Sequence, residues 1–84
     1  MPESVKMYSL STCGHCKAAK ELLDGLSVEY ASTDVDLLEG EEKRKVIREV
    51  IRLNPQCSFP TIVIGDRVIV GNREDQIREA LGMA

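Results

Sequence analysis

Apolar residues along the chain follow two different spacings, which predict short strands alternating with amphipathic helices. The segment VKMYSL at residues 5–10 is rich in apolar residues and bounded by polar ones, as is typical of a short strand. Ser11 and Thr12 come next and offer side-chain oxygens that could cap a helix beginning near Cys13. The apolar residues of this helix form one stripe at i, i+3, i+4 and i+7, namely Ala19, Leu22, Leu23 and Leu26. We expect the helix to end by Ser27.

The middle of the chain predicts a second strand and a second helix. The segment VEYAST at residues 28–33 alternates loosely between apolar and polar positions and fits a strand. Further on, apolar residues recur at helical spacing among charged ones, namely Val46, Ile47, Val50 and Ile51. This pattern predicts a helix over residues 41–53, which Asn54–Pro55 should stop because proline cannot continue a helix.

The last third of the chain predicts a hairpin and a closing helix. The strand-like segments TIVIG and RVIVG meet at a two-residue step, Gly65–Asp66, which is a strong hairpin signal. A helix is expected from about Arg73, with Ile77, Ala80 and Leu81 on its buried side.

Together these elements predict a single α/β domain over residues 1–84 with the element order βαβαββα. Because a βαβ unit crosses over right-handedly, the first two strands should be parallel. The hairpin should extend the sheet in antiparallel fashion. The expected architecture is a four-stranded mixed sheet with helices on both faces.

Composition and charge narrow the classes of partner. The net charge of −3 gives no electrostatic reason to expect a nucleic-acid partner. No apolar run approaches the roughly 20 residues of a membrane span, and the first residues lack the layout of a signal peptide. We therefore expect a cytoplasmic protein with no membrane partner. Residues 41–84 carry seven acidic and eight basic side chains; this basic half either docks an acidic partner or is a solvated helix face.

Three cysteines are present, and Cys13 and Cys16 form a C-x-x-C pair. An odd number of cysteines without an export signal disfavours a disulfide framework, so the pair indicates redox chemistry or metal binding. At the start of a helix, backbone amides and the helix dipole stabilise a thiolate on Cys13. Cys13 should therefore attack a disulfide first, and Cys16, one turn further along, should resolve the mixed disulfide.

Several neighbouring residues leave two interpretations open. A protonated His15 would lower the pKa of Cys13 and make the disulfide more oxidising, or His15 is an exposed loop side chain. Lys17 and Lys20 either add positive potential or are simply solvated. Cys57 is either a small buried apolar residue or a further redox thiol or cluster ligand. A zinc site is not expected, because closed sites generally need four ligands and no second cysteine pair is present.

Three segments, in the expected order, carry a family resemblance. YSLSTCGHC resembles the strand–dithiol–helix opening of the glutaredoxin branch of the thioredoxin fold, SFPTIVIG its proline-then-strand element, and VGNRED its glycine turn before the last helix. The likeness covers nearly the whole chain. It implies a dithiol–disulfide oxidoreductase that acts on disulfide-containing proteins through a redox-active Cys13–Cys16 disulfide, with no tightly bound cofactor.

The resemblance also implies a substrate surface. In this family the proline before the third strand is typically cis and faces the dithiol, so Pro60 would leave the backbone beside it free to pair with an extended substrate. On the same grounds, the residues expected to bind substrate or glutathione are Phe59, Pro60, Thr61, Gly71, Arg73 and Glu74.

The sequence departs from the family at three places. Leu10 replaces a lysine that pairs with a glutathione carboxylate, His15 replaces an aromatic residue, and Gly71–Asn72 replaces a glycine pair. Losing the lysine removes a charge-assisted hydrogen bond, which disfavours specific use of glutathione but leaves general dithiol exchange. The CGHC tetrad itself resembles the active sites of protein disulfide isomerases, which we interpret as tuning of the redox potential.

The resemblance leaves the electron donor and one alternative function open. Glutathione, a flavin-dependent thioredoxin reductase or a ferredoxin-dependent reductase could each reduce the oxidised protein, which we expect to be a monomer. Some glutaredoxins hold an iron–sulfur cluster. The alternative is therefore a metal-handling module that binds such a cluster, or zinc, through Cys13.

Overall fold

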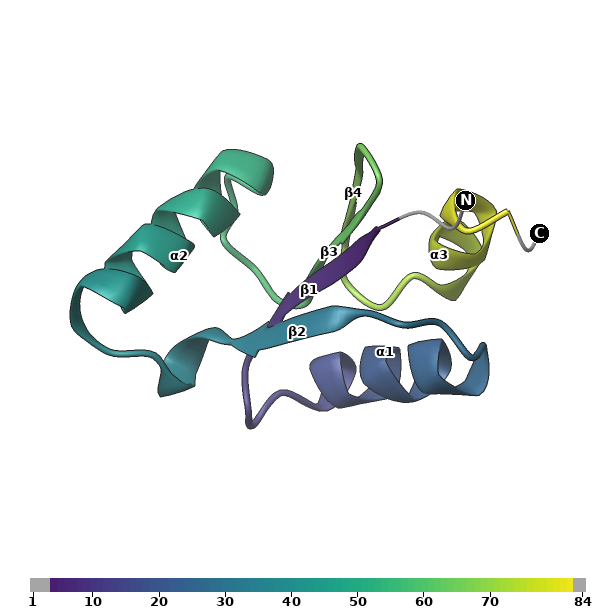
Figure 1. The fold of residues 1–84 in the computed structure, drawn as a ribbon, viewed down its shortest axis with the longest axis horizontal. Coiled ribbons are helices and arrows are strands. Elements are labelled where there is room, and N and C mark those ends of the chain that lie inside the picture. Colours follow the sequence, from purple (N-terminus) through teal and green to yellow (C-terminus); the bar gives the residue numbers. More distant parts are fainter. Residues whose placement is uncertain (1–3, 83–84) are drawn as a thin grey trace.

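Four strands form one mixed sheet in the order β2–β1–β3–β4 (Figure 1). The computed structural model describes residues 4–82, with strands at β1 (Val5–Ser9), β2 (Ala31–Asp34), β3 (Thr61–Ile64) and β4 (Arg67–Val70). β1 is parallel to β2 and antiparallel to β3, and β3 pairs with β4 as an antiparallel hairpin. The predicted fold class and element order are confirmed.

Helices cover both faces of the sheet. α1 (Gly14–Gly25) and α3 (Glu74–Ala80) pack on one face, and α2 (Gly40–Leu53) packs on the other (Figure 1). Because side chains alternate along a strand, Met7 of β1 joins the first core cluster and the neighbouring Tyr8 joins the second. The short helix α3 is held by Ile77, which is fully buried, and burying such a side chain is worth about 2 kcal/mol.

One helix cap and one element boundary differ from the prediction. α1 begins at Gly14, close to the predicted start, but Cys13 caps it in place of Ser11 or Thr12, and the Ser11 side chain bonds Asp36. The second strand begins at Ala31 rather than residue 28. The chain between α1 and this strand first closes the helix: the amide of Val28 donates to the Leu23 carbonyl at 3.1 Å, and Ser27 adopts a positive φ of 57°. This is the Schellman arrangement of helix ends.

A single turn of 3₁₀ helix, η1 (Val35–Leu37), follows β2 and was not predicted. The other helices lie close to their predicted ranges, since α2 ends at Leu53 before Asn54–Pro55 and α3 begins one residue after Arg73. Among residues 4–82, no helix is both long and apolar enough to cross a membrane.

The sheet register brings four strand ends together. Ser9 lies beside Asp34, Tyr8 lies beside Thr61, and Thr61 lies beside Val70. The C-terminal ends of β1, β2 and β4 and the N-terminal end of β3 therefore share one end of the sheet. The loop that leads to Cys13 leaves from this end.

Candidate dithiol site

Cys13 occupies the position just before the first turn of α1. Its sulfur accepts a hydrogen bond from the backbone amide of Cys16 at 3.3 Å, and its side chain is partly exposed. A hydrogen bond from the Cys16 thiol lowers the pKa of Cys13, the backbone amides of Cys16 and His15 lower it further, and burial opposes them. The Cys13 sulfur is therefore the one that more readily becomes a thiolate.

Cys16 has the opposite character. It is 1% exposed and lies on the face of α1 that packs against the sheet. Burial raises its pKa to about 11, and the hydrogen bond and charge of Cys13 act in the same direction. The backbone amide of Leu10 and the charge of Lys20 pull the pKa of Cys16 down. The two thiols are thus chemically unequal, with Cys16 kept protonated beneath a more acidic Cys13.

The residues around the pair are exposed. His15 and Lys17 both lie at the surface of α1's first turns. A cavity of about 250 Å³ lies beside Cys13, between the loop that precedes it and the first turns of α1. It is lined by Leu10, Ser11, Thr12, Cys13, Gly14, Lys17 and Lys20.

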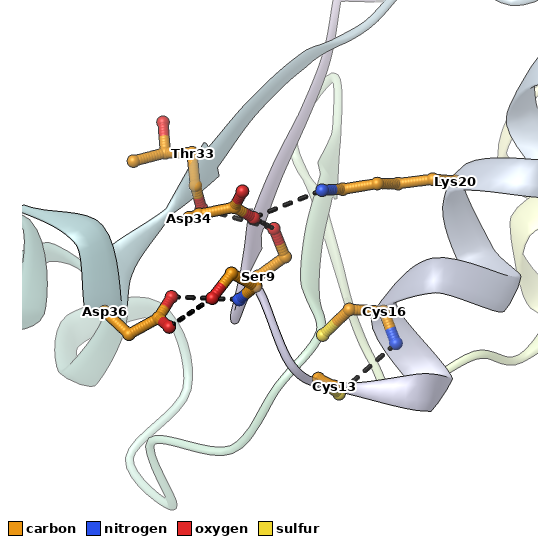
Figure 2. A network of polar contacts seen from close by, with 8 residues as sticks. Ser9, Cys13, Cys16, Lys20, Thr33, Asp34 and Asp36 are labelled. Atoms are coloured by element: carbon orange, nitrogen blue, oxygen red, sulfur yellow. Dashed lines mark hydrogen bonds and ion pairs between the residues drawn. The ribbon is translucent and has the colours of Figure 1, made fainter.

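A polar network lies between α1 and the end of β2 (Figure 2). Ser9 donates its hydroxyl to Asp34 Oδ1 at 2.6 Å, and Lys20 Nζ lies 3.1 Å from the same oxygen. The hydrogen bond from Ser9 and the charge of Lys20 lower the pKa of Asp34. In Figure 2, the Cys16 side chain and the Lys20 chain leave α1 toward the same region beside β1. Lys20 is therefore a cation held near the buried thiol.

A second carboxylate fixes the loop before Cys13. Asp36 accepts hydrogen bonds from the backbone amide of Ser11 at 2.9 Å and from its hydroxyl, and these bonds lower the pKa of Asp36 (Figure 2). The sequence interpretation missed both aspartates. The signal was available in the parallel pairing of the first two strands, which sets the segment around Asp34 beside Ser9.

The predicted proline segment lies at the same end of the sheet. The Phe59–Pro60 peptide bond is cis, as the family resemblance implied, and Pro60 is fully buried. The Gly71 amide donates to the Pro60 carbonyl at 2.9 Å, so the turn before α3 lies against this segment. Among residues 4–82, the backbone amide and carbonyl of Phe59 have no hydrogen-bond partner. Backbone groups without an internal partner can bond to water or to another chain.

The other predicted binding residues differ in what their side chains can reach. Thr61 is fully buried, and its hydroxyl donates to the Ser58 carbonyl at 2.8 Å. Its side chain therefore supports the loop and does not face solvent. Arg73 and Glu74 are exposed at the start of α3, where Glu74 pairs with Arg78 at 2.9 Å.

Cys57 lies in the loop between α2 and β3 and packs against the interior. It is partly buried, contacts the cluster of Tyr8, Val35 and Val50, and has a positive φ of 49°. Within the described residues 4–82, no group of three or more histidine, cysteine, aspartate or glutamate side chains is arranged to hold a metal ion.

Comparisons with known proteins show which family the chain resembles. The glutaredoxin family model matches residues 5–69. The methanoredoxin of Methanosarcina acetivorans is 52% identical, with a TM-score of 0.89 over 94% of this chain and 84% of that one. A glutaredoxin from Archaeoglobus fulgidus is 39% identical, with a TM-score of 0.89 over 98% of this chain and 88% of that one. An uncharacterised glutaredoxin-like protein from the rubredoxin operon of Clostridium pasteurianum is 33% identical over 87% of this chain and 91% of the relative.

The fold is a thioredoxin-like sheet with a cysteine pair at the start of its first helix. The chain belongs to the glutaredoxin family. Family and fold support a thiol–disulfide oxidoreductase-like function.

Proposed function

We propose that the protein is a dithiol–disulfide oxidoreductase that reduces disulfides in other proteins through Cys13 and Cys16. The observation that carries this proposal is the opposite character of two neighbouring thiols: the pKa of the partly exposed Cys13 is lowered, while that of the buried Cys16 is raised to about 11. A nucleophile needs the first property, and a resolving thiol that must wait for a mixed disulfide needs the second.

The reaction takes two exchanges. The Cys13 thiolate attacks one sulfur of the substrate disulfide, a Cys13–substrate bond forms, and the other substrate sulfur leaves as a thiolate that takes up a proton. Cys16 then loses its proton and attacks the Cys13 sulfur. The mixed disulfide breaks, the second substrate sulfur leaves as a thiolate that takes up a proton, and a Cys13–Cys16 disulfide remains. Two electrons have passed from the dithiol to the substrate.

The surrounding residues take supporting roles in this proposal. Lys20 favours ionisation of Cys16 during the second exchange, since its charge lowers the pKa of that thiol. Lys17 adds positive potential at the exposed start of α1, and His15, between the two cysteines, tunes the redox potential. No resident cofactor takes part, and the protein acts as a cytoplasmic monomer.

Substrate binds across the end of the sheet. The open backbone of Phe59 pairs with an extended segment next to the substrate disulfide, as a strand adds to a sheet edge. Pro60 and Thr61 support this backbone, and Gly71, Arg73 and Glu74 border it. An external donor, either glutathione or a reductase, then returns two electrons to the Cys13–Cys16 disulfide. Leu10 in place of a lysine favours a reductase.

The test is reduction of insulin disulfides by the protein with dithiothreitol as donor. The wild-type protein should turn over. Cys13→Ser should lower the rate by about a thousandfold or more, to the uncatalysed level, because the nucleophile is gone. Cys16→Ser should accumulate a mixed disulfide that mass spectrometry detects on Cys13.

The matched control is Cys57→Ser, which should keep the wild-type rate because the Cys57 thiol packs in a core cluster and takes part in neither exchange. A wild-type protein without turnover, or a Cys13→Ser variant that retains it, would refute the proposed function.

A further inference from the structure

Asn54 is a buried polar residue that neither the sequence interpretation nor the exchange mechanism explains. It ends α2 and is 3% exposed. Its side-chain nitrogen lies 3.2 Å from the Ser58 carbonyl, 3.0 Å from the Ser58 hydroxyl and 3.2 Å from the Thr61 hydroxyl. Its side-chain oxygen accepts from the backbone amide of Gln56 at 3.2 Å. Both the nitrogen and the oxygen of the Asn54 side-chain amide therefore have hydrogen-bond partners within or beside one loop.

Through these hydrogen bonds, the Asn54 side chain connects the start and the end of the loop between α2 and β3. Gln56 lies near the start of the connection from α2 to β3, while Ser58 and Thr61 flank the Phe59–Pro60 step at its end. The main chain of Asn54 adds a further tie, because its carbonyl accepts from the Cys57 amide at 2.8 Å. A buried amide left without partners costs free energy, so this arrangement of the loop is strongly preferred over ones that break the bonds.

The backbone that the network flanks is the one left open toward a substrate. Phe59 lies between the Asn54 partners Ser58 and Thr61, and within residues 4–82 its amide and carbonyl are unpaired. Thr61 is in register with Tyr8 of β1, so Phe59 lies at the sheet end from which the chain runs to Cys13. Pairing with an extended chain requires this backbone to be held in one orientation.

We propose that Asn54 is a positioning residue that makes the protein selective for disulfides within extended polypeptides over small disulfide molecules. It acts through the loop backbone at Phe59. A small disulfide needs only the Cys13 sulfur, whereas a polypeptide also needs the open backbone. This inference rests on the proposed function and adds to it the substrate class and the residue that selects it.

The experiment compares Asn54→Asp with Gln56→Glu. Both changes replace an amide by a carboxylate of the same shape and add the same charge in the same loop. Gln56 is exposed, whereas the Asn54 nitrogen donates to Ser58 and Thr61. Each variant is assayed with insulin and with hydroxyethyl disulfide, and the Cys13 thiol is titrated.

Asn54→Asp should raise KM for insulin by roughly three- to tenfold, the factor expected for lost buried hydrogen bonds. Its kcat for insulin, its kinetics with hydroxyethyl disulfide and the pKa of Cys13 should stay as in the wild type. Gln56→Glu should change none of them. An equal loss with both substrates would mean that Asn54 only supports the fold, and an unchanged insulin KM would mean that it does not position the loop; either result overturns the inference.

A milder variant keeps the inference testable if Asn54→Asp does not fold. Ser58→Ala removes one hydrogen-bond partner of Asn54 at a partly exposed position, and it should reproduce the insulin-specific rise in KM at about twofold or more. A Ser58→Ala variant with wild-type KM for insulin would then overturn the inference. If the wild-type protein reduces neither substrate, the failure belongs to the proposed function instead.

Discussion

The two sides of the dithiol site are built from different kinds of interaction. On the side of α1, charges and hydrogen bonds act directly on sulfur: Cys16 and nearby amides lower the pKa of Cys13, and Lys20 lies close enough to influence Cys16. On the side of the α2–β3 loop, the buried side-chain amide of Asn54 bonds Ser58 and Thr61, which flank Phe59 and Pro60.

We therefore expect the α1 side to set the reactivity of the two thiols and the loop side to set the binding of the substrate chain. Changes on the α1 side should alter the rates of thiol exchange with every disulfide. Changes on the loop side should alter only how well an extended substrate binds. The following variants, in order of decreasing effect, test whether the α1 side works as described.

The largest effect in this set is expected from Lys20→Met. Without the ammonium group, the pKa of Cys16 rises above about 11, so fewer molecules carry the thiolate needed for the second exchange. Turnover with insulin should fall by roughly three- to fivefold. The loss is modest because the charge of Lys20 is the weakest of the influences on the pKa of Cys16. The rate of the first exchange, measured in the Cys16→Ser background, should stay unchanged.

Lys45→Met is the matched control for this variant, because Lys45 is an exposed lysine on α2, away from the dithiol. It should keep wild-type turnover. If Lys20→Met slows the first exchange as much as turnover, Lys20 acts on Cys13 or on substrate binding and its assigned role is wrong.

A smaller effect, on stability, is expected from Asp34→Asn. The hydrogen bond from Ser9 and the charge of Lys20 lower the pKa of Asp34 in the folded protein. The carboxylate therefore stabilises the fold above the ordinary carboxyl pKa, and this contribution is lost as the pH falls through the lowered value. Asp34→Asn should reduce the free energy of unfolding by about 1 kcal/mol at neutral pH, with a smaller difference below about pH 4.

Urea unfolding at several pH values measures this difference. Glu29→Gln serves as control, since Glu29 is exposed and lies before β2. A deficit of Asp34→Asn that does not shrink in acid would show that the lost stability comes from packing instead of from the ionised carboxylate.

The sequence predicted the fold well because its signals are local. Helical spacing marked α1 and α2, and Gly65–Asp66 marked the hairpin. The start of the second strand was wrong because a Schellman arrangement at Ser27 uses the amide of Val28, and nothing in the loosely alternating segment 28–33 indicated it.

The candidate site was predictable only in part, because some of its residues act through contacts that depend on the folded structure. Cys13 and Cys16 are separated by only two residues and form a recognisable C-x-x-C motif. Asp34 bonds Ser9 and Lys20, which lie 25 and 14 positions away in the sequence, and Asn54 bonds Thr61, seven positions away. These bonds exist only once the strand register and the loop path are fixed. From the sequence alone, Asn54 before Pro55 predicts only the end of a helix. No sequence pattern indicates that its side-chain amide is buried and hydrogen-bonded.

The most direct test of the account is alkylation of the reduced protein with iodoacetamide over a range of pH, with each cysteine followed by mass spectrometry. Cys13 should react first, with a midpoint below that of an ordinary cysteine, because hydrogen bonds from Cys16 and His15 lower its pKa. Cys16 should stay unmodified until strongly alkaline pH, in keeping with burial and a pKa of about 11. Equal reactivity of the two thiols, or a Cys13 midpoint at the value of a free cysteine, would contradict the unequal pair on which the mechanism depends.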